Sequence, residues 1–117
     1  MPSAIRPQTN AQVGKATFEK VAAGGSFGKA VTLTGPQLDA LEKNLTTLAR
    51  SNPQRAAQLL QRTLDLYGQG KIKVNIEGAP VSHAGRNAIA SFANDVSAAI
   101  QRADPSVATP APMMLAR

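Results

Sequence analysis

Hydrophobic residues recur at helical spacing in a first stretch from about Pro36 to Arg50. Thr34 and Gln37 have the spacing of a capping box, and Pro36 falls in the first turn, where its missing N–H costs no hydrogen bond. The pattern therefore predicts a helix with one narrow apolar face. Its four leucines, three or four positions apart, are Leu38, Leu41, Leu45 and Leu48.

A second helical pattern follows at once. Asn52 is the predicted N-cap, Pro53 the first helical residue and Gly68 the left-handed stop. Because the connection to the first helix is so short, we expect the two to form an antiparallel helical hairpin. The wider apolar face of this helix comprises Ala56, Leu59, Leu60, Thr63, Leu64, Leu66 and Tyr67.

A third, long helix is predicted from about His83 to Ala103. Ser82 is its candidate cap, and Asp104 with Pro105 ends it. Several positions of its buried face are alanines, which favour close approach of neighbouring helices. That face comprises Ala88, Ile89, Phe92, Val96, Ala99, Ile100 and Ala103.

Two short segments, 29–34 and 71–76, have the composition of strands. In the second segment Ile72 and Val74 alternate with Lys71 and Lys73. A pair of strands is marginal by itself in water, so its apolar side is expected to pack on the helices. A weaker helical pattern over 11–23 is interrupted by Gly14.

These elements predict an α+β fold that is mainly α: an antiparallel helical hairpin, a third long helix and a two-stranded β-ribbon. We expect one compact domain at 29–104. Residues 1–28 are interpreted as a flexible N-terminal segment, with or without a short helix at 11–23. Residues 105–117 are interpreted as a disordered tail, because their alternating prolines exclude both a helix and a central strand.

Composition narrows the classes of function. The 117 residues include no Cys and one His, which argues against a structural zinc site, an iron–sulfur cluster and a thiol nucleophile. No apolar run approaches the roughly 18 residues of a membrane span, and residues 1–12 lack the features of a Sec signal. We therefore expect no metal, no cofactor, no small-molecule substrate and no transmembrane segment. The expected location is the cytoplasm, or outside the cell by a route without a Sec signal peptide.

Catalytic motifs are weak. The segment 24–29 (GGSFGK) departs from the phosphate-loop pattern, since Ala23 stands where that pattern needs Gly and Ala30 where it needs Ser or Thr. Ser82 and His83 are the only adjacent hydroxyl and imidazole, and a helix cap beside a surface histidine explains them more simply. No pair of acidic residues has a spacing that favours acid–base catalysis. We expect no enzyme and assign no catalytic residue.

Charge offers another candidate site. Thirteen Lys and Arg against seven Asp and Glu give a net charge of +6, which favours an anionic partner. Acidic residues one helical turn away weaken this pattern, as Asp39 does for Lys43 and Asp65 for Arg62. If the hairpin and the strands pack side by side, the basic residues form one anion- or partner-binding surface. Its candidate members are Lys29, Lys43, Arg50, Arg55, Arg62, Lys71 and Lys73.

Two hypotheses for function follow. The first is a small non-catalytic module that binds another protein or a second copy of itself, because a domain of about 75 residues rarely gains more than ~3–5 kcal/mol from its core. In a variant of it the chain is a bacterial secreted effector, or a fragment of one, since its polar start has no acid before Glu19, as in type III secretion signals. Such an effector would act on a host protein or an anionic membrane surface. The alternative is a basic protein that binds nucleic acid through the basic residues.

Overall fold

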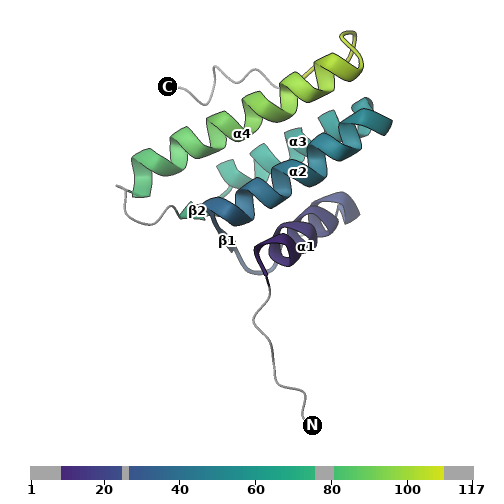
Figure 1. Ribbon diagram of the computed structural model, residues 1–117. Helices are drawn as coiled ribbons and strands as arrows, with labels where there is room; N and C mark the ends of the chain where they lie inside the picture. The colour runs from purple at the N-terminus through teal and green to yellow at the C-terminus, as the bar shows by residue number, and fades with distance from the viewer. Residues whose placement is uncertain (1–8, 25–26, 76–80, 110–117) are drawn as a thin grey trace.

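The structure, a computed structural model, describes residues 9–24, 27–75 and 81–109, with the backbone alone for 81–87. The predicted α+β, mainly helical fold is confirmed (Figure 1). The elements in chain order are α1 (Asn10–Ala23), β1 (Val31–Thr34), α2 (Gly35–Ser51), α3 (Pro53–Gly68), β2 (Ile72–Asn75) and α4 (Val81–Ala103).

The start of the helical hairpin forms as its sequence predicts. The Thr34 hydroxyl accepts a hydrogen bond from the Gln37 backbone N–H at 3.4 Å, and the Gln37 side chain accepts one from the Thr34 N–H at 3.0 Å. At the turn into α3, the Asn52 side chain accepts from the Arg55 N–H at 3.1 Å. The helix α3 then runs back behind α2, which makes the pair antiparallel (Figure 1).

Two predicted helix ends were wrong. Gly68 is still helical, and the left-handed residue is Gly70, with φ +79°. The turn is longer because the Gln69 N–H donates to the Asp65 carbonyl and the Gly70 N–H donates to the Tyr67 carbonyl. The second wrong end is the start of α4. This helix begins at Val81, so Ser82 lies inside the helix instead of capping it.

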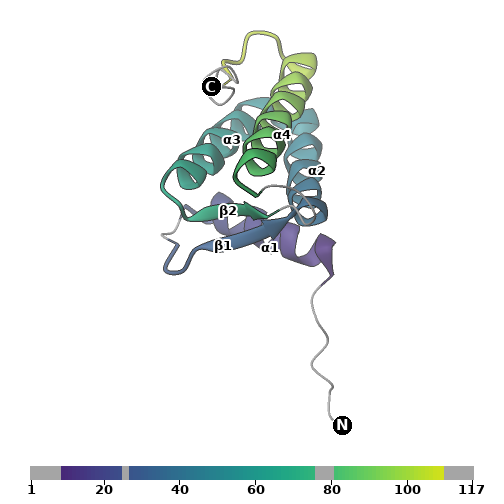
Figure 2. The same cartoon turned by 90° about the vertical axis from the view of Figure 1, so that its left-hand side faces the viewer.

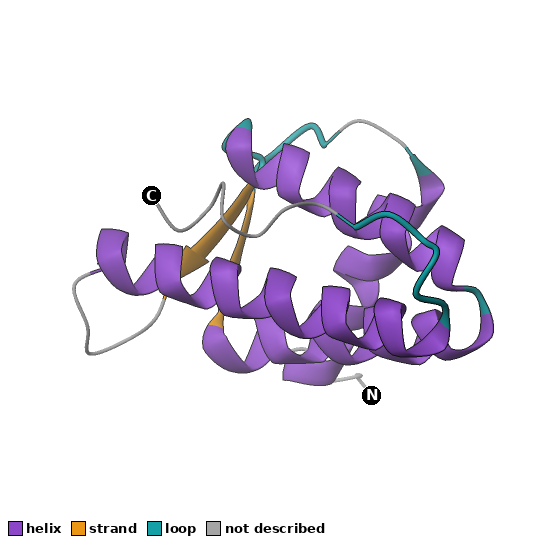
Figure 3. Cartoon of the chain, turned by 90° about the horizontal axis from the view of Figure 1, so that it is seen from above, coloured by secondary structure: helices purple, strands orange, loops and turns teal. Residues whose placement is uncertain are grey.

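The two strands are parallel, with Val31 beside Ile72 and Leu33 beside Val74. The expected ribbon is therefore corrected to a parallel pair. The reason is the helical hairpin: α2 carries the chain away from β1 and α3 brings it back, so β2 runs in the same direction as β1 (Figure 2). Seen from above, both strands lie near one end of the helices (Figure 3).

The helix α2 is central, with α1 on one side, α4 on the other and α3 behind it (Figure 1). Three of its four predicted leucines are buried, while Leu48 is half-buried and turned toward α1. The largest fully buried side chains in the core are Phe92, Leu33, Leu41, Leu45, Leu60, Ile72, Ile89 and Ile100.

The helix α1 packs closely along α2. Its start has a capping box between Thr9 and Gln12. A Cβ on Gly14 would lie 2.8 Å from the backbone nitrogen of Leu41, so only glycine fits this crossing of the two helices. Val21 is buried at the end of the helix, and so is Phe27 in the following loop. The packed part of the chain thus starts before residue 29, the boundary expected from the sequence.

Residues 104–109 follow the end of α4. The Asp104 carboxylate accepts hydrogen bonds from the Ser106 N–H at 3.0 Å and the Ser106 hydroxyl at 2.7 Å, and these bonds lower the pKa of Asp104. Val107 is half-buried against the core. The tails expected to be flexible lie, at 1–8 and 110–117, outside the described residues. None of the described helices is long and apolar enough to cross a membrane.

Candidate functional site

The outer side of α2 is open to solvent. Asp39, Lys43, Thr47 and Arg50 are all exposed along it. The helices α1 and α4 flank α2 on its two sides (Figure 1). An open groove lies between α2 and each of them. We refer to these grooves as the α1/α2 groove and the α2/α4 groove.

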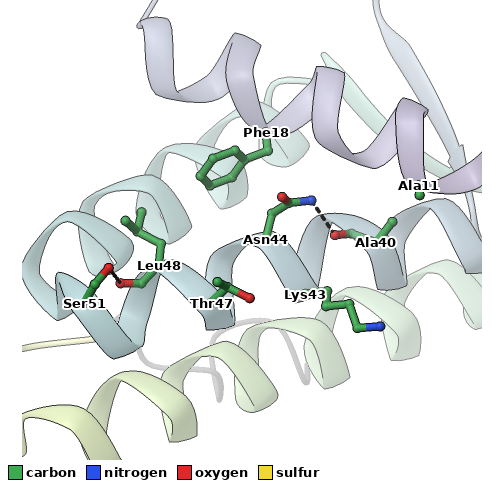
Figure 4. A pocket seen from close by; sticks show the side chains of 8 residues that line it. All are labelled: Ala11, Phe18, Ala40, Lys43, Asn44, Thr47, Leu48 and Ser51. Atoms are coloured by element: carbon green, nitrogen blue, oxygen red, sulfur yellow. Dashed lines mark hydrogen bonds between the residues drawn. The ribbon is translucent and has the colours of Figure 1, made fainter.

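The α1/α2 groove has an apolar floor. Figure 4 shows Phe18 of α1 pointing toward α2, above Asn44 and Leu48. The Asn44 side-chain amide donates to the Ala40 carbonyl at 2.8 Å, and the Ser51 hydroxyl donates to the Leu48 carbonyl at 3.2 Å. These polar side chains therefore bond within α2 itself. The lining residues are Ala11, Phe18, Ala40, Lys43, Asn44, Thr47, Leu48 and Ser51.

The α2/α4 groove is lined by charged side chains at its ends and by small side chains in its middle. The two helices run parallel, because each follows one strand of the parallel pair (Figure 1). Glu42 of α2 meets Asp95 of α4 near one end. The rest of the groove is lined by Thr46, Arg50, Asp95, Ala99, Arg102 and Ala103.

The acidic end of this groove changes the protonation of Glu42. Its pKa is raised from the usual 4.5 to about 7, first because the carboxyl is partly buried. The negative charge of Asp95, the hydrogen bond that protonated Glu42 donates to it, and the charge of Asp39 raise this pKa further. Among the described residues, no group of three or more His, Cys, Asp or Glu has the arrangement of a metal site. The acidic end is thus a concentration of negative charge, partly relieved by a proton.

The seven basic residues proposed from the sequence are distributed over α2, α3 and the strand region. Lys43 and Arg50 are exposed on α2, whereas Arg62 is half-buried on α3. Arg55 donates a hydrogen bond from its guanidinium to the Ala22 carbonyl at 2.8 Å, so it ties the start of α3 to the end of α1.

The remaining three basic residues lie at the strands. Lys29 is exposed ahead of β1, Lys71 is half-buried just before β2, and Lys73 is exposed beside Thr32 on the outer face of the sheet. The seven residues thus lie on α2, on α3 and at the two strands. Of the acidic neighbours that weakened the pattern, Asp65 accepts a hydrogen bond from Gln61 at 3.0 Å.

Sequence reasoning missed the charged pattern of the α2/α4 groove. The sequence pattern singled out neither Glu42 nor Asp95 nor Arg102 as a site residue. A signal was present on α2, where Asp39, Glu42, Thr46 and Arg50 follow one another at spacings of three, four and four, which places them on one stripe. The position of α4 beside that stripe is a tertiary property.

Comparisons of the chain with protein-family models, with curated proteins and with solved structures find no match. A function must therefore follow from the surface chemistry of this chain.

Proposed function

We propose that the protein is a non-catalytic interaction module that binds another protein chain through the outer side of α2 and the two grooves beside it. The observation that carries this proposal is the exposed ridge of α2 between two helices, with an open groove on each side. A ridge flanked by grooves is the shape against which another helix packs.

The chemistry of this surface favours a protein over a nucleic acid. Its apolar part is contributed by Phe18 and Leu48 in the α1/α2 groove. The acids Asp39, Glu42 and Asp95 would repel phosphate groups approaching the other groove. A partner with apolar side chains and charges of both signs fits this surface best.

Site-specific photo-crosslinking in the producing cell tests the proposal on the full chain. A photoreactive residue replaces Thr47 on the exposed ridge, and the matched control replaces Gln54, which is exposed on α3. We expect covalent adducts with a protein at position 47, at least tenfold more abundant than at position 54. Equal yields at the two positions, or adducts with nucleic acid alone at position 47, would contradict the proposal.

A second candidate, nucleic-acid binding, is favoured by one observation. Lys73 and Thr32 are neighbours on the outer face of the two strands, and Lys71 precedes β2. Such binding would weaken with salt by a log–log slope of about −0.9 per phosphate contacted. We expect the double variant K71Q/K73Q to lose that binding. No binding of DNA or RNA by the unmodified chain at ~50 mM salt excludes this candidate.

A further inference from the structure

The α2/α4 groove carries opposite charges at its two ends. Glu42 of α2 lies next to Asp95 of α4, at the same height along the two parallel helices, and Asp39 adds a third acid at that end. Arg50 and Arg102 line the other end of the groove. Because an α-helix rises 1.5 Å per residue, Asp39 and Arg50 are separated by about 16 Å along α2.

Within the described part of the chain, the charges at the two ends of the groove do not pair with each other. Glu42 and Asp95 are turned toward each other, although both are acids. Arg50 and Arg102 form no ion pair with any other residue of the described part of the chain. Along α2, Glu42 lies about 12 Å from Arg50, well beyond the reach of a direct ion pair. The groove is thus complementary to a surface with the opposite order of charges.

We propose that the occupant of the α2/α4 groove is a second copy of this chain, packed antiparallel about a two-fold axis at the level midway between Asp39 and Arg50 of α2. This inference rests on the proposed function and names the partner. In this arrangement the acidic end of each copy lies against the arginine end of the other. Asp39 of each copy therefore faces Arg50 of its partner, which gives two such contacts. A two-fold interface must be complementary to itself, and this groove meets that condition.

The charges also select the direction of packing. A parallel arrangement would place the acids of one copy against the acids of the other, and like charges in contact oppose association. The middle of the groove is lined by Thr46 and Ala99, whose small side chains allow helix axes to approach to about 8–10 Å. With α2 about 25 Å long and each helix about 10 Å wide, α2 and α4 together provide a face of about 500 Å², which is of the same order as the ~800 Å² that each partner buries in a stable interface.

Charge exchange tests this geometry by sedimentation equilibrium over a concentration series of the full chain. We expect dimers for the unmodified protein, and a dissociation constant raised tenfold or more in D39R and in R50E. Mixing these two variants should restore association to within about threefold, because every contact between positions 39 and 50 is then attractive again. The matched controls D65R on α3 and K73E on β2 should dimerise like the unmodified protein, since both positions are exposed outside the groove.

The unmodified chain provides a second measurement. Approach of two arginines favours the ionised form of Glu42, which Asp39 on its own helix and Asp95 on α4 disfavour. Dimers should therefore be tighter at pH 8 than at pH 5.5, and E42Q should lose this difference.

Three outcomes would overturn the inference: a chain that stays monomeric up to millimolar concentration, a dimer indifferent to both charge changes, or a dimer equally stable at pH 5.5 and pH 8. Adducts with a different protein at position 47, together with a monomeric chain, would leave the proposed function intact and reject only self-association. Equal crosslinking at positions 47 and 54 would reject the proposed function itself.

Discussion

The two sides of α2 differ in how completely their polar and charged side chains find partners among the described residues. Toward α1, Gly14 brings the helices into backbone contact, and the side chains of Asn44 and Ser51 bond to carbonyls of their own helix. Toward α4, the partly buried carboxyl of Glu42 lies against that of Asp95, so that burial and this neighbour raise the pKa of Glu42, and Arg50 has no ionic partner among the described residues. One side of α2 is organised for packing within the chain. The other retains charge that a partner can use.

This difference distinguishes a contact that serves the fold from a surface that is available for binding. A contact that serves only the fold tolerates little change in shape, because packed interiors have few voids. Under our proposal the α4 side serves binding, and such a surface costs the isolated chain some stability, here through carboxyl groups of like charge held together. Substitutions on the two sides of α2 should therefore have effects of opposite sign on the stability of the monomer.

The largest effect is expected on the α1 side. Gly14→Ala places a methyl group against the backbone of α2, which must move, so the free energy of unfolding should fall by about 1–3 kcal/mol. Urea denaturation measures this change. The matched control is Gly68→Ala, where nothing lies within 4 Å of the new Cβ and the effect should be zero or slightly stabilising. Equal effects of the two substitutions would show that α1 does not pack on α2 in this way.

On the α4 side, Glu42→Gln should stabilise the monomer at high pH. The folded-state pKa of about 7 exceeds the usual 4.5, so the folded chain binds more protons between these values and its stability falls as the pH rises through them. The variant lacks this loss. Its free energy of unfolding should match that of the unmodified chain near pH 4.5.

At pH 8, the E42Q variant should be more stable than the unmodified chain by about 1 kcal/mol, a figure reduced for solvent screening at a partly exposed site. Denaturation at both pH values, in protein dilute enough to be monomeric, makes the measurement. The control Asp65→Asn changes an exposed acid on α3 and should retain the fall in stability. A persisting fall in E42Q would contradict the environment assigned to Glu42.

A smaller effect is expected where α3 is tied to α1. Arg55→Met keeps most of the aliphatic stem and removes the hydrogen bond to the Ala22 carbonyl, which should cost about 0.5–1 kcal/mol. Thermal or urea unfolding of the dilute chain measures it. Arg102→Met is the matched control, since Arg102 has no ion pair with another described residue. A larger loss in the control would reverse the comparison between the two sides of α2.

Local chemistry allowed most of the fold to be predicted. The Thr34–Gln37 capping box and the Asn52–Pro53 pair act within a few residues, so the starts of α2 and α3 can be read from the sequence. Gly14 misled because it lowers helix propensity, while its real role is a contact with residues 40 and 41. The parallel pairing of the strands also depends on the path of α2 and α3, which no local pattern specifies.

The candidate site was predicted less well. Lys43 and Arg50 are exposed on α2, and the other five proposed residues lie on α3 and at the strands. Arg55 is an example. Its positive charge predicts contact with an anionic partner, but in the fold its guanidinium donates a hydrogen bond to the end of α1. The acids of the α2/α4 groove come from two helices far apart in the sequence, so their proximity follows only from tertiary packing.

Disulfide crosslinking tests the proposed antiparallel contact most directly, because the chain contains no cysteine. An equimolar mixture of the D39C and R50C variants is oxidised and resolved on a non-reducing gel. Each variant contains one cysteine, so a disulfide must join two chains. Because positions 39 and 50 lie about 16 Å apart along α2, a bond between them requires two α2 helices that run in opposite directions. We predict a covalent dimer in the mixture and little in either variant alone. Dimers of equal yield in the separate variants, or none in the mixture, would contradict the antiparallel contact.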